Sequence, residues 1–277
     1  MTTTNAGGTA DLLDLAEQMA RAAGAELMSR YGNIQGLGTK SSATDPVSDA
    51  DRAAEALIAA MLLEQRPQDG MIGEEGAARG SESGITWVID PLDGTVNYLY
   101  QLDNFSVSIA AEDAEGGLVG VVFDPVMNRM YTAVRGAGAF LDGRVLRVNE
   151  SVELDNALLG TGFGYSAERR SAQAAILANL LPRIRDIRRF GSAALNLCQL
   201  AAGQLDAYYE EGVQHWDVAA GGLIAREAGA LMTTSSLTGA STGWLVAGPT
   251  LHAALSDALG RPWAGLPPGS IGSSARV

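Results

Sequence analysis

Residues 105–148 form a series of short β-type runs separated by turn residues, and this series restricts the fold more than any other part of the sequence. Apolar and polar side chains alternate along "FSVSIAAED" and "RMYTAVRG", which is the period of a half-buried strand. The Asp142-Gly143 pair in "GAFLDGRVLRV" is a hairpin turn signal. We therefore expect an antiparallel meander with strands at 105–113, 116–125, 129–136 and 138–148.

After the meander, short strands alternate with helices. Gly203 and Gly229 follow apolar helical patterns and are expected to close them, and Pro249 lies near the first position of the last helix. A meander followed by such alternation is typical of a layered α+β sandwich. The expected strands are 157–164, a short one in "DIRRFGS", 205–212 and 243–249, and the expected helices are 167–182, 193–203, 217–229 and 249–259.

Two helices are expected before the meander, over about residues 10–30 and from about Ser48 to Glu64, because apolar residues recur there at helical spacing. Trp87–Ile89 is expected to be a buried strand. We assign the chain to one domain of residues 9–260. Its antiparallel half covers about 9–150 and its alternating half about 151–260, between a flexible leader, 1–8, and a disordered tail, 261–277.

Composition excludes several classes of protein. The net charge of −13 argues against a large nucleic-acid surface, since phosphate backbones bind Lys and Arg, but it is compatible with a site that gathers metal cations. No apolar run approaches the roughly 20 residues that a membrane span needs. We recognise no signal peptide, and the single cysteine, Cys198, excludes an internal disulfide and fits a reducing cytoplasm. We therefore expect a cytoplasmic protein with no membrane partner and no direct nucleic-acid binding.

The stretch "WVIDPLDGTVNYLY", residues 87–100, places Asp90 and Asp93 where a buried strand should turn into a loop. Taken alone, Asp-Pro-Leu-Asp-Gly is equally well explained as ordinary turn chemistry. The short helix expected after it begins near Gly94 and Thr95.

Three further acidic segments also have structural explanations when each is taken alone. "GEEG" places Glu74 and Glu75 between glycines, as in a solvated acidic loop. Asp217, in "WDVAAGGLIAREAGA", could be a helix N-cap. Asp51 has capping-box spacing with Ser48.

The order of these segments is more specific than any one of them. "GEEG", "WVIDPLDGTVNYLY" and "WDVAAGGLIAREAGA" resemble, in this order, the characteristic motifs of the inositol monophosphatase family, over about residues 10–260. The resemblance implies an αβαβα sandwich of the sugar phosphatase type, a homodimer and sensitivity to Li⁺. It also implies a Mg²⁺-dependent phosphomonoesterase that hydrolyses myo-inositol monophosphate to inositol and phosphate. Gln101 departs from the pattern, because relatives often have glycine there.

The resemblance assigns roles to particular residues. Asp51 matches an aspartate that pairs with a threonine, here Thr95, to orient or activate the attacking water, and Glu74 belongs with them in the catalytic set. Lys40 and Glu75 are further candidates near the metal. Two or three Mg²⁺ ions, or Mn²⁺ in their place, are expected to be held by Glu74, Asp90, the backbone carbonyl of Leu92, Asp93 and Asp217.

The physical chemistry of these residue types agrees with the assignment. Mg²⁺ prefers oxygen ligands in near-octahedral geometry, and carboxylates with a peptide carbonyl supply them. Crowded carboxylates repel one another, so the cluster without cations is expected to be costly. Amides at a helix start favour an anion, so substrate phosphate is expected against Gly94 and Thr95. Two or three metals can stabilise both the attacking water and the leaving oxygen.

The second half is expected to supply the substrate side. Glu210 matches a glutamate that binds sugar hydroxyls, and we prefer it to its neighbour Glu211. "GTGFG", residues 160–164, is interpreted as a strand end on the substrate side, because no acid follows at the spacing of a dinucleotide site. Asp93, Asp217, Gly191, Ser192 and Ala193 complete the expected substrate contacts, although Ser192 can also be a helix N-cap.

Two alternatives stay open. The same chemistry could act on fructose-1,6-bisphosphate, histidinol phosphate or a 3′-phosphonucleotide, although "GTVNYLY" is more similar to the inositol type. In a different class, the chain could be a protein partner in an RNA- or ribosome-associated complex, as some bacterial relatives are.

Overall fold

The computed structural model describes residues 6–33, 38–39, 46–235, 242–260 and 264–265. Residues 1–5 of the expected leader, the candidate Lys40 and most of the expected tail lie outside the described residues.

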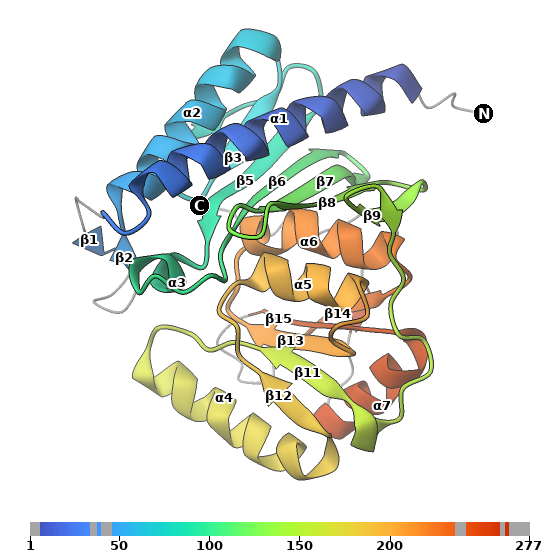
Figure 1. Cartoon of the computed structure of the whole chain (residues 1–277). Helices are drawn as coiled ribbons and strands as arrows, with labels where there is room; N and C mark the ends of the chain where they lie inside the picture. The colour runs from blue at the N-terminus through green and yellow to red at the C-terminus, as the bar shows by residue number, and fades with distance from the viewer. Residues whose placement is uncertain (1–5, 34–37, 40–45, 236–241, 261–263, 266–277) are drawn as a thin grey trace.

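The described residues stack in five layers (Figure 1). One pair of helices covers the outer face of the first sheet, a second pair lies between the two sheets, and a third pair covers the outer face of the second sheet. The predicted αβαβα sandwich is confirmed. The three pairs are α1 (Ala6–Arg30) with α2 (Asp49–Gln65), α5 (Ala193–Ala201) with α6 (His215–Glu227), and α4 (Ala167–Leu180) with α7 (Pro249–Leu259).

The first sheet has eight strands within the described residues, in the order β10-β9-β8-β7-β6-β5-β3-β4. Only the β3–β5 pair in this order is parallel, so the predicted meander is confirmed. Asp142 and Gly143 form the predicted hairpin turn, with φ of 48° and 77°. The strands are β3 (Gly70–Gly73), β4 (Ala78–Arg79), β5 (Thr86–Asp93), β6 (Ser106–Asp113), β7 (Gly116–Asp124), β8 (Arg129–Val134), β9 (Gly138–Leu141) and β10 (Arg144–Val145).

The second sheet is mixed. Its described part has the order β12-β11-β13-β15-β14-β16, in which β11 pairs in parallel with both neighbours. The last strand belongs to the segment expected to be a disordered tail, yet it pairs with β14. The strands are β11 (Leu158–Thr161), β12 (Asp186–Arg188), β13 (Ala207–Glu211), β14 (Leu231–Ser235), β15 (Gly243–Ala247) and β16 (Ala264–Gly265).

Short elements complete the chain. β1 (Gly38–Thr39) and β2 (Pro46–Val47) pair with each other, and α3 (Thr95–Leu99) follows β5. Two 3₁₀ turns, η1 (Leu154–Asn156) and η2 (Leu181–Arg183), flank the outer helices of the second half.

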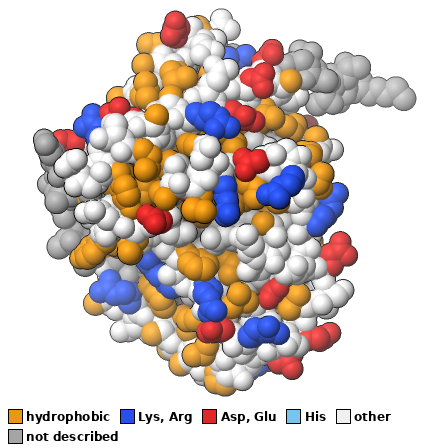
Figure 2. Space-filling model, viewed as in Figure 1, with side chains coloured by type: hydrophobic (Ala, Val, Ile, Leu, Met, Phe, Trp, Pro, Cys, Tyr) orange, Lys and Arg blue, Asp and Glu red, His pale blue; other side chains and the backbone are white. Residues whose placement is uncertain are grey.

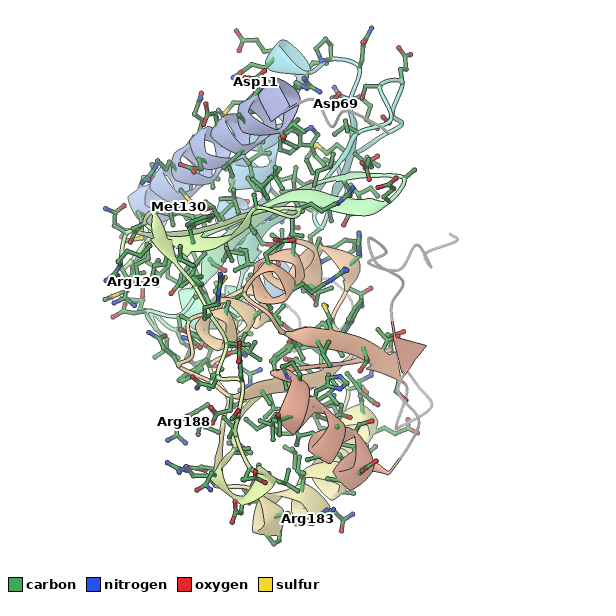
Figure 3. All side chains as sticks on the ribbon, turned by 90° about the vertical axis from the view of Figure 1, so that its right-hand side faces the viewer. Asp11, Asp69, Arg129, Met130, Arg183 and Arg188 are labelled. Atoms are coloured by element: carbon green, nitrogen blue, oxygen red, sulfur yellow. The ribbon has the colours of Figure 1, made fainter. Side chains whose placement is uncertain are left out.

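Successive side chains along the strands of the first sheet point to opposite faces and pack into two different cores. Val88 and Ala110 face the layer of α5 and α6, while their neighbours Ile89 and Ile109 face α1 and α2. Met130, on β8, belongs to the core beneath α1 and α2, as the side view in Figure 3 shows. Because both faces are covered, these strands are apolar on both sides, and polar groups at the sheet end stand out.

Several element boundaries differ from expectation. Helix α1 begins earlier, at Ala6, and α6 begins at His215 rather than Asp217. Strand β5 continues past Asp90 to Asp93 instead of ending at the first acid. Gln101 has a positive φ of 56°, which explains why glycine suits that position.

Candidate active site

The two acids of β5 meet because the strand contains a bulge. Asp90 pairs with Ser108 and Asp93 with Ser106, so one extra residue lies on the β5 side of the ladder. The Leu92 N–H donates to Asp90 Oδ1 at 3.0 Å and stabilises the irregular segment. The interpretation of Asp-Pro-Leu-Asp-Gly as a turn is therefore correct for the local backbone, but this turn bends the strand instead of ending it.

Gly94 allows the chain to leave the bulge. Its φ is 98°, and a Cβ there would lie 2.9 Å from the backbone oxygen of Asn104. Glycine is thus required both by conformation and by space. The next residue, Thr95, begins α3.

Asp93 is held by the start of α5, a segment far away in the sequence. Its carboxylate accepts hydrogen bonds from Ser192 Oγ at 2.5 Å, Ala194 N at 2.7 Å and Ala193 N at 3.2 Å. Burial raises the pKa of Asp93 to about 6, although these three donors oppose the shift. Ser192 also accepts from Leu195 N and caps α5, so the N-cap interpretation of Ser192 is confirmed.

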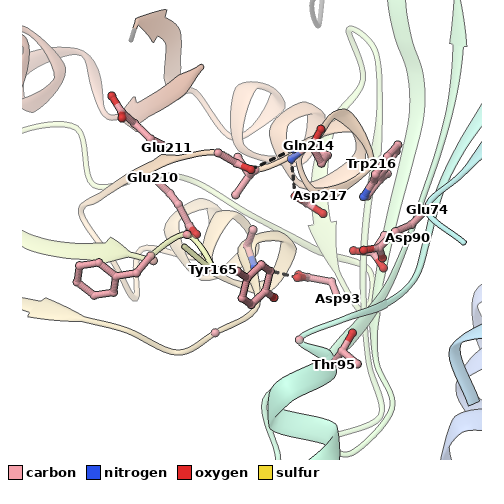
Figure 4. Close-up of a pocket in the computed structure, with 18 of the residues that line it drawn as sticks. Glu74, Asp90, Asp93, Thr95, Tyr165, Glu210, Glu211, Gln214, Trp216 and Asp217 are labelled. Carbon is pink, nitrogen blue, oxygen red and sulfur yellow. Dashed lines mark hydrogen bonds between the residues drawn. The ribbon is translucent and has the colours of Figure 1, made fainter. Parts of the chain in front are cut away.

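Six acidic residues line one cavity of about 390 Å³, and besides Glu210 and Glu211 of β13 they are Glu74, Asp90, Asp93 and Asp217 (Figure 4). The pKa of Asp90 is raised well above its usual range, first by burial and then by the charges of Glu74, Asp93 and Asp217. Burial, Glu74 and Asp93 likewise raise the pKa of Asp217. Among the described residues, no three His, Cys, Asp or Glu side chains form a ready-made metal cage. The four carboxylates therefore influence one another electrostatically, but they do not surround a single metal position.

Asp217 is the third residue of α6 and not its N-cap. Its carboxylate accepts from the backbone N–H of Gln214 at 2.6 Å, and Gln214 is the N-cap in a reciprocal capping box. The simple N-cap interpretation is wrong. Helix capping instead fixes a carboxylate that also faces the cavity.

Thr95 and Asp51 are brought together, as predicted. The Thr95 hydroxyl lies 3.2 Å from Asp51 Oδ1 and 3.1 Å from the Leu92 carbonyl oxygen. The other Asp51 oxygen accepts from Ser48 N at 2.9 Å and from Ser48 Oγ at 2.5 Å. Asp51 is thus a capping-box residue of α2 and the partner of Thr95 at once. Together with the four acids and Leu92, Thr95 forms what we call the carboxylate wall of the cavity.

The opposite side of the cavity, the glycine wall, consists of Gly162, Phe163, Gly164, Tyr165, Gly191 and Glu210. The predicted position of "GTGFG" at a strand end facing this site is confirmed for residues 162–164, which follow β11. A Cβ on Gly162 would lie 2.1 Å from Glu210 Oε1, so glycine leaves the room that this glutamate occupies.

Glu210 and Glu211 point to opposite faces of β13, as period-2 alternation requires. Glu210 faces the cavity and accepts a hydrogen bond from Tyr208 Oη at 2.8 Å (Figure 4). Burial raises the pKa of Glu210 to about 7, while Tyr208 and Arg189 act in the opposite direction. The preference for Glu210 over Glu211 agrees with this orientation.

The remaining candidates are placed less directly. Gly191 and Ala193 line the cavity, whereas Ser192 is fully buried behind it. Glu75 follows Glu74 but is not among the described residues that line the cavity. His215, which the sequence did not suggest as a site residue, is the first residue of α6. Its Nε2 lies 2.9 Å from Glu112 Oε2.

Several lining residues were missed by sequence reasoning. Tyr165, Arg169 and Gln214 come from loops or helix starts that carry no recognised motif. Gln173 lies behind the glycine wall. Its side chain accepts from Gly164 N at 2.8 Å and donates to the Glu211 carbonyl at 3.0 Å. The only local signal for this group is the helix start at Ser166, which does not reveal what the helix faces.

Comparison with known proteins gives the class. The sequence pattern of the family described as "Inositol monophosphatase family" matches residues 9–260. "Inositol-1-monophosphatase SuhB" of Mycobacterium tuberculosis is 44% identical, covering 91% of this chain and 94% of that protein. "Nus factor SuhB" of Escherichia coli is 38% identical, with coverage of 90% and 99%.

Solved structures agree. The extragenic suppressor protein suhB from Bartonella henselae has a TM-score of 0.84 at 34% identity, covering 91% of this chain and 99% of that chain. SaIMPase-II has been solved with inositol monophosphate bound, with a TM-score of 0.74, 27% identity and coverage of 89% and 92%. It has also been solved with 2′-AMP bound, with a TM-score of 0.73, 26% identity and coverage of 89% and 93%.

The layered fold, the acidic cavity and these relatives together define a phosphatase. More specifically, the chain belongs to the inositol monophosphatase family. No helix among the described residues is long and apolar enough to cross a membrane.

Proposed function

We propose that the protein is a Mg²⁺-dependent phosphomonoesterase whose preferred substrate is myo-inositol monophosphate. The observation that carries the proposal is the convergence of four carboxylates from β5, α6 and the loop after β3 on one cavity. The donor set fits a hard cation, because it offers carboxylate and carbonyl oxygens without thiol or imidazole. Mn²⁺ would suit the same oxygens.

In this proposal Glu74, Asp90, the Leu92 carbonyl, Asp93 and Asp217 hold two or three metal ions. When bound, the ions supply Lewis-acid stabilisation of the phosphoryl oxygens and of the leaving oxygen. The Thr95 hydroxyl, held by Asp51, orients the attacking water, and the carboxylate of Asp51 is placed to accept a proton through Thr95. The amides of Gly94 and Thr95, which line the cavity, donate to the phosphate.

On the glycine wall, Glu210 accepts hydrogen bonds from ring hydroxyls of the leaving group, and Gly191, with the nearby Ala193, provides a close surface for the ring. This assignment is supported by the cavity-facing position of Glu210 and by the inositol monophosphate bound to the similar protein SaIMPase-II. A polyol fits such a wall because each hydroxyl can donate to a carboxylate.

A phosphate-release panel tests the proposal. The substrates are myo-inositol 1-phosphate, fructose-1,6-bisphosphate, histidinol phosphate, a 3′-phosphonucleotide and 2′-AMP, each with Mg²⁺, without Mg²⁺, and with added Li⁺. We expect Mg²⁺-dependent, Li⁺-sensitive release that is fastest with inositol phosphate. A faster reaction with 2′-AMP would shift the preference to nucleotides, for which the other SaIMPase-II complex and the aromatic Phe163 and Tyr165 give a reason.

A second candidate function is that of a protein partner in a complex with RNA, suggested by the E. coli relative called a Nus factor. The net charge of −13 argues against direct RNA binding, and on the face in Figure 2 basic and acidic side chains are interspersed. Absence of phosphate release from every substrate, together with a stable complex with an RNA- or ribosome-associated protein, would favour this function.

Assembly and location complete the proposal. We expect a homodimer, which light scattering on the purified protein tests directly. A cytoplasmic location is supported by Cys198, which is free and buried, as suits a reducing compartment.

A further inference from the structure

Helix α2 contacts two separate parts of the carboxylate wall. Asp51, in its first turn, accepts a hydrogen bond from Thr95 in the turn after β5. Glu55 lies one helical turn further on, on the same side of the helix, and it contacts the loop that carries Glu74. One helix therefore touches both segments through two carboxylates.

The Glu55 side chain holds this loop by its backbone. Its Oε2 accepts from Glu75 N at 2.8 Å, and its Oε1 accepts from Ala77 N at 2.9 Å. Glu55 is only 5% exposed, and a buried carboxylate is tolerated when donors of this kind satisfy it. The two carboxylate oxygens of Glu55 thus hold the backbone N–H groups of residues 75 and 77, and we call this pair of hydrogen bonds the clamp.

Glu74 is fixed from both sides as a result. Its own N–H donates to the carbonyl of Ile89 in β5 at 3.1 Å, and the next N–H in the chain is the one that Glu55 accepts. A hydrogen bond between the Glu74 and Asp90 side chains contributes to the raised pKa of Asp90, so the two carboxyl groups are in contact. The direction of the Glu74 carboxyl therefore depends on the backbone that Glu55 holds.

Gly73 provides the space for this clamp. A Cβ at Gly73 would lie 2.2 Å from Glu55 Oε2 and 2.7 Å from Glu55 Cδ. Gly73 has no positive φ, so its glycine is explained by the carboxylate beside it and not by backbone conformation. The contact therefore requires both glycine at position 73 and glutamate at position 55.

We propose that Glu55 is a positioning residue that aims the Glu74 carboxylate at the cavity, and that α2 sets the spacing between Glu74 and the Thr95 turn. The proposal rests on the function proposed above only in taking Glu74 as a metal ligand. The clamp itself is a property of the backbone, and it can be measured without turnover.

The first test is Glu55→Gln in the full-length protein. Glutamine has one acceptor oxygen and one NH₂ group, so one of the two loop amides loses its acceptor and meets a donor. We expect faster hydrogen exchange in residues 73–77 and about tenfold weaker Mg²⁺ binding by calorimetry without substrate, the usual size for removing support from a metal ligand. Glu64→Gln, an exposed glutamate of the same helix, is the matched control and should change neither.

The second test leaves Glu55 intact. Gly73→Ala puts a methyl group where the carboxylate lies, so it should displace the clamp and reproduce both effects. Gly80→Ala is the control, because a Cβ there meets nothing within 4 Å and Gly80 has no positive φ. Agreement between two variants that share only this contact would assign the effect to the clamp.

Unchanged exchange and unchanged Mg²⁺ binding in Glu55→Gln and Gly73→Ala would overturn the proposal, even if both variants melt at lower temperature, because that result describes a purely structural contact. Failure of the wild type to release phosphate would overturn the proposed function instead. In that case, weakened Mg²⁺ binding in the two variants would still support the positioning role.

Discussion

The two walls of the cavity differ in how their side chains are held. On the carboxylate wall, Asp93 accepts three hydrogen bonds from the start of α5, and Thr95 is tied to both Asp51 and Leu92. On the glycine wall, Gly162, Gly164 and Gly191 leave room for the side chains of neighbouring residues, and Glu210 accepts one side-chain hydrogen bond among the described residues, from Tyr208. Rigid donors and acceptors suit a reaction with one geometry, whereas a wall with fewer hydrogen bonds suits leaving groups of different shape.

This contrast predicts that changes to the carboxylate wall reduce kcat with every substrate, while changes to the glycine wall alter KM and depend on the substrate. The variants below test that division, beginning with the largest expected effect.

Asp93→Asn should reduce kcat by about a thousandfold or more with every phosphate ester, because Lewis-acid assistance is worth several kcal/mol. The asparagine oxygen can still accept from Ser192 and Ala194, so the fold should persist. Phosphate release and circular dichroism measure the two effects, and Asp155→Asn on an exposed turn is the control. Near-normal activity would remove Asp93 from the metal site.

Thr95→Val should reduce kcat by about a hundredfold with little change in KM, because a positioned proton-transfer group contributes at least that much. Valine has nearly the same shape but cannot donate to Asp51. Thr95→Ser keeps the hydroxyl and should retain most activity in the same steady-state assay. Equal losses in the two variants would argue against a role for the hydroxyl.

Glu210→Gln should raise KM for inositol phosphate by about tenfold, the effect of losing charged hydrogen bonds worth roughly 1.5 kcal/mol. A simple aryl phosphate without ring hydroxyls should be hydrolysed as before. The measurement is kcat and KM for the two substrates side by side. Equal losses with both would contradict the division between the walls.

The same residue predicts a pH effect on stability. Its pKa is raised from 4.5 to about 7 in the folded protein, so between these values the folded state holds a proton that the unfolded state has lost. The unfolding free energy of the wild type therefore falls as pH rises through this window. Glu210→Gln should melt at a higher temperature than the wild type at pH 8, with a smaller difference at pH 4.5. A difference that does not change with pH would contradict the raised pKa.

Ser192→Ala is expected to have the smallest effect and lies at the junction of the two walls. It removes one donor to Asp93 and the N-cap of α5, while the amides of Ala193 and Ala194 remain. We expect a loss of about 1 kcal/mol in unfolding free energy, measured by denaturant titration, with only a severalfold change in kcat. A loss of activity as large as that of Asp93→Asn would show that the hydroxyl itself is part of the reacting site.

Much of the fold was predictable because its signals are local. Alternation and a two-residue turn predicted the hairpin at Asp142, Pro249 predicted where α7 begins, and Gly203 and Gly229 predicted the ends of α5 and α6. The bulge in β5 was not predicted, because the sequence Asp-Pro-Leu-Asp-Gly is equally compatible with a turn that ends a strand and with one that bends it. Only the pairing with β6 distinguishes the two.

The candidate site was predictable for a different reason, namely the order of three motifs along the chain. What the motifs could not provide is the set of residues that hold them. Glu55 lies four residues after Asp51, which is a helical signal, but nothing in the sequence indicates that it faces the loop at residues 73–77. Tyr165 and Arg169 were missed because they lie in the loop before α4 and in the first turn of α4, where the sequence has no motif.

The sequence by itself determined which groups are available: acids at the end of a buried strand, glycines where the chain turns sharply, and strands of the right period. The tertiary structure decided which of these groups meet. Asp93 and the N-terminus of α5 are 99 to 101 residues apart, and Thr95 and Asp51 are 44 apart. Contacts over such separations form only when two sheets and their helices pack together, because local preferences act over a few residues while burial acts on the whole chain.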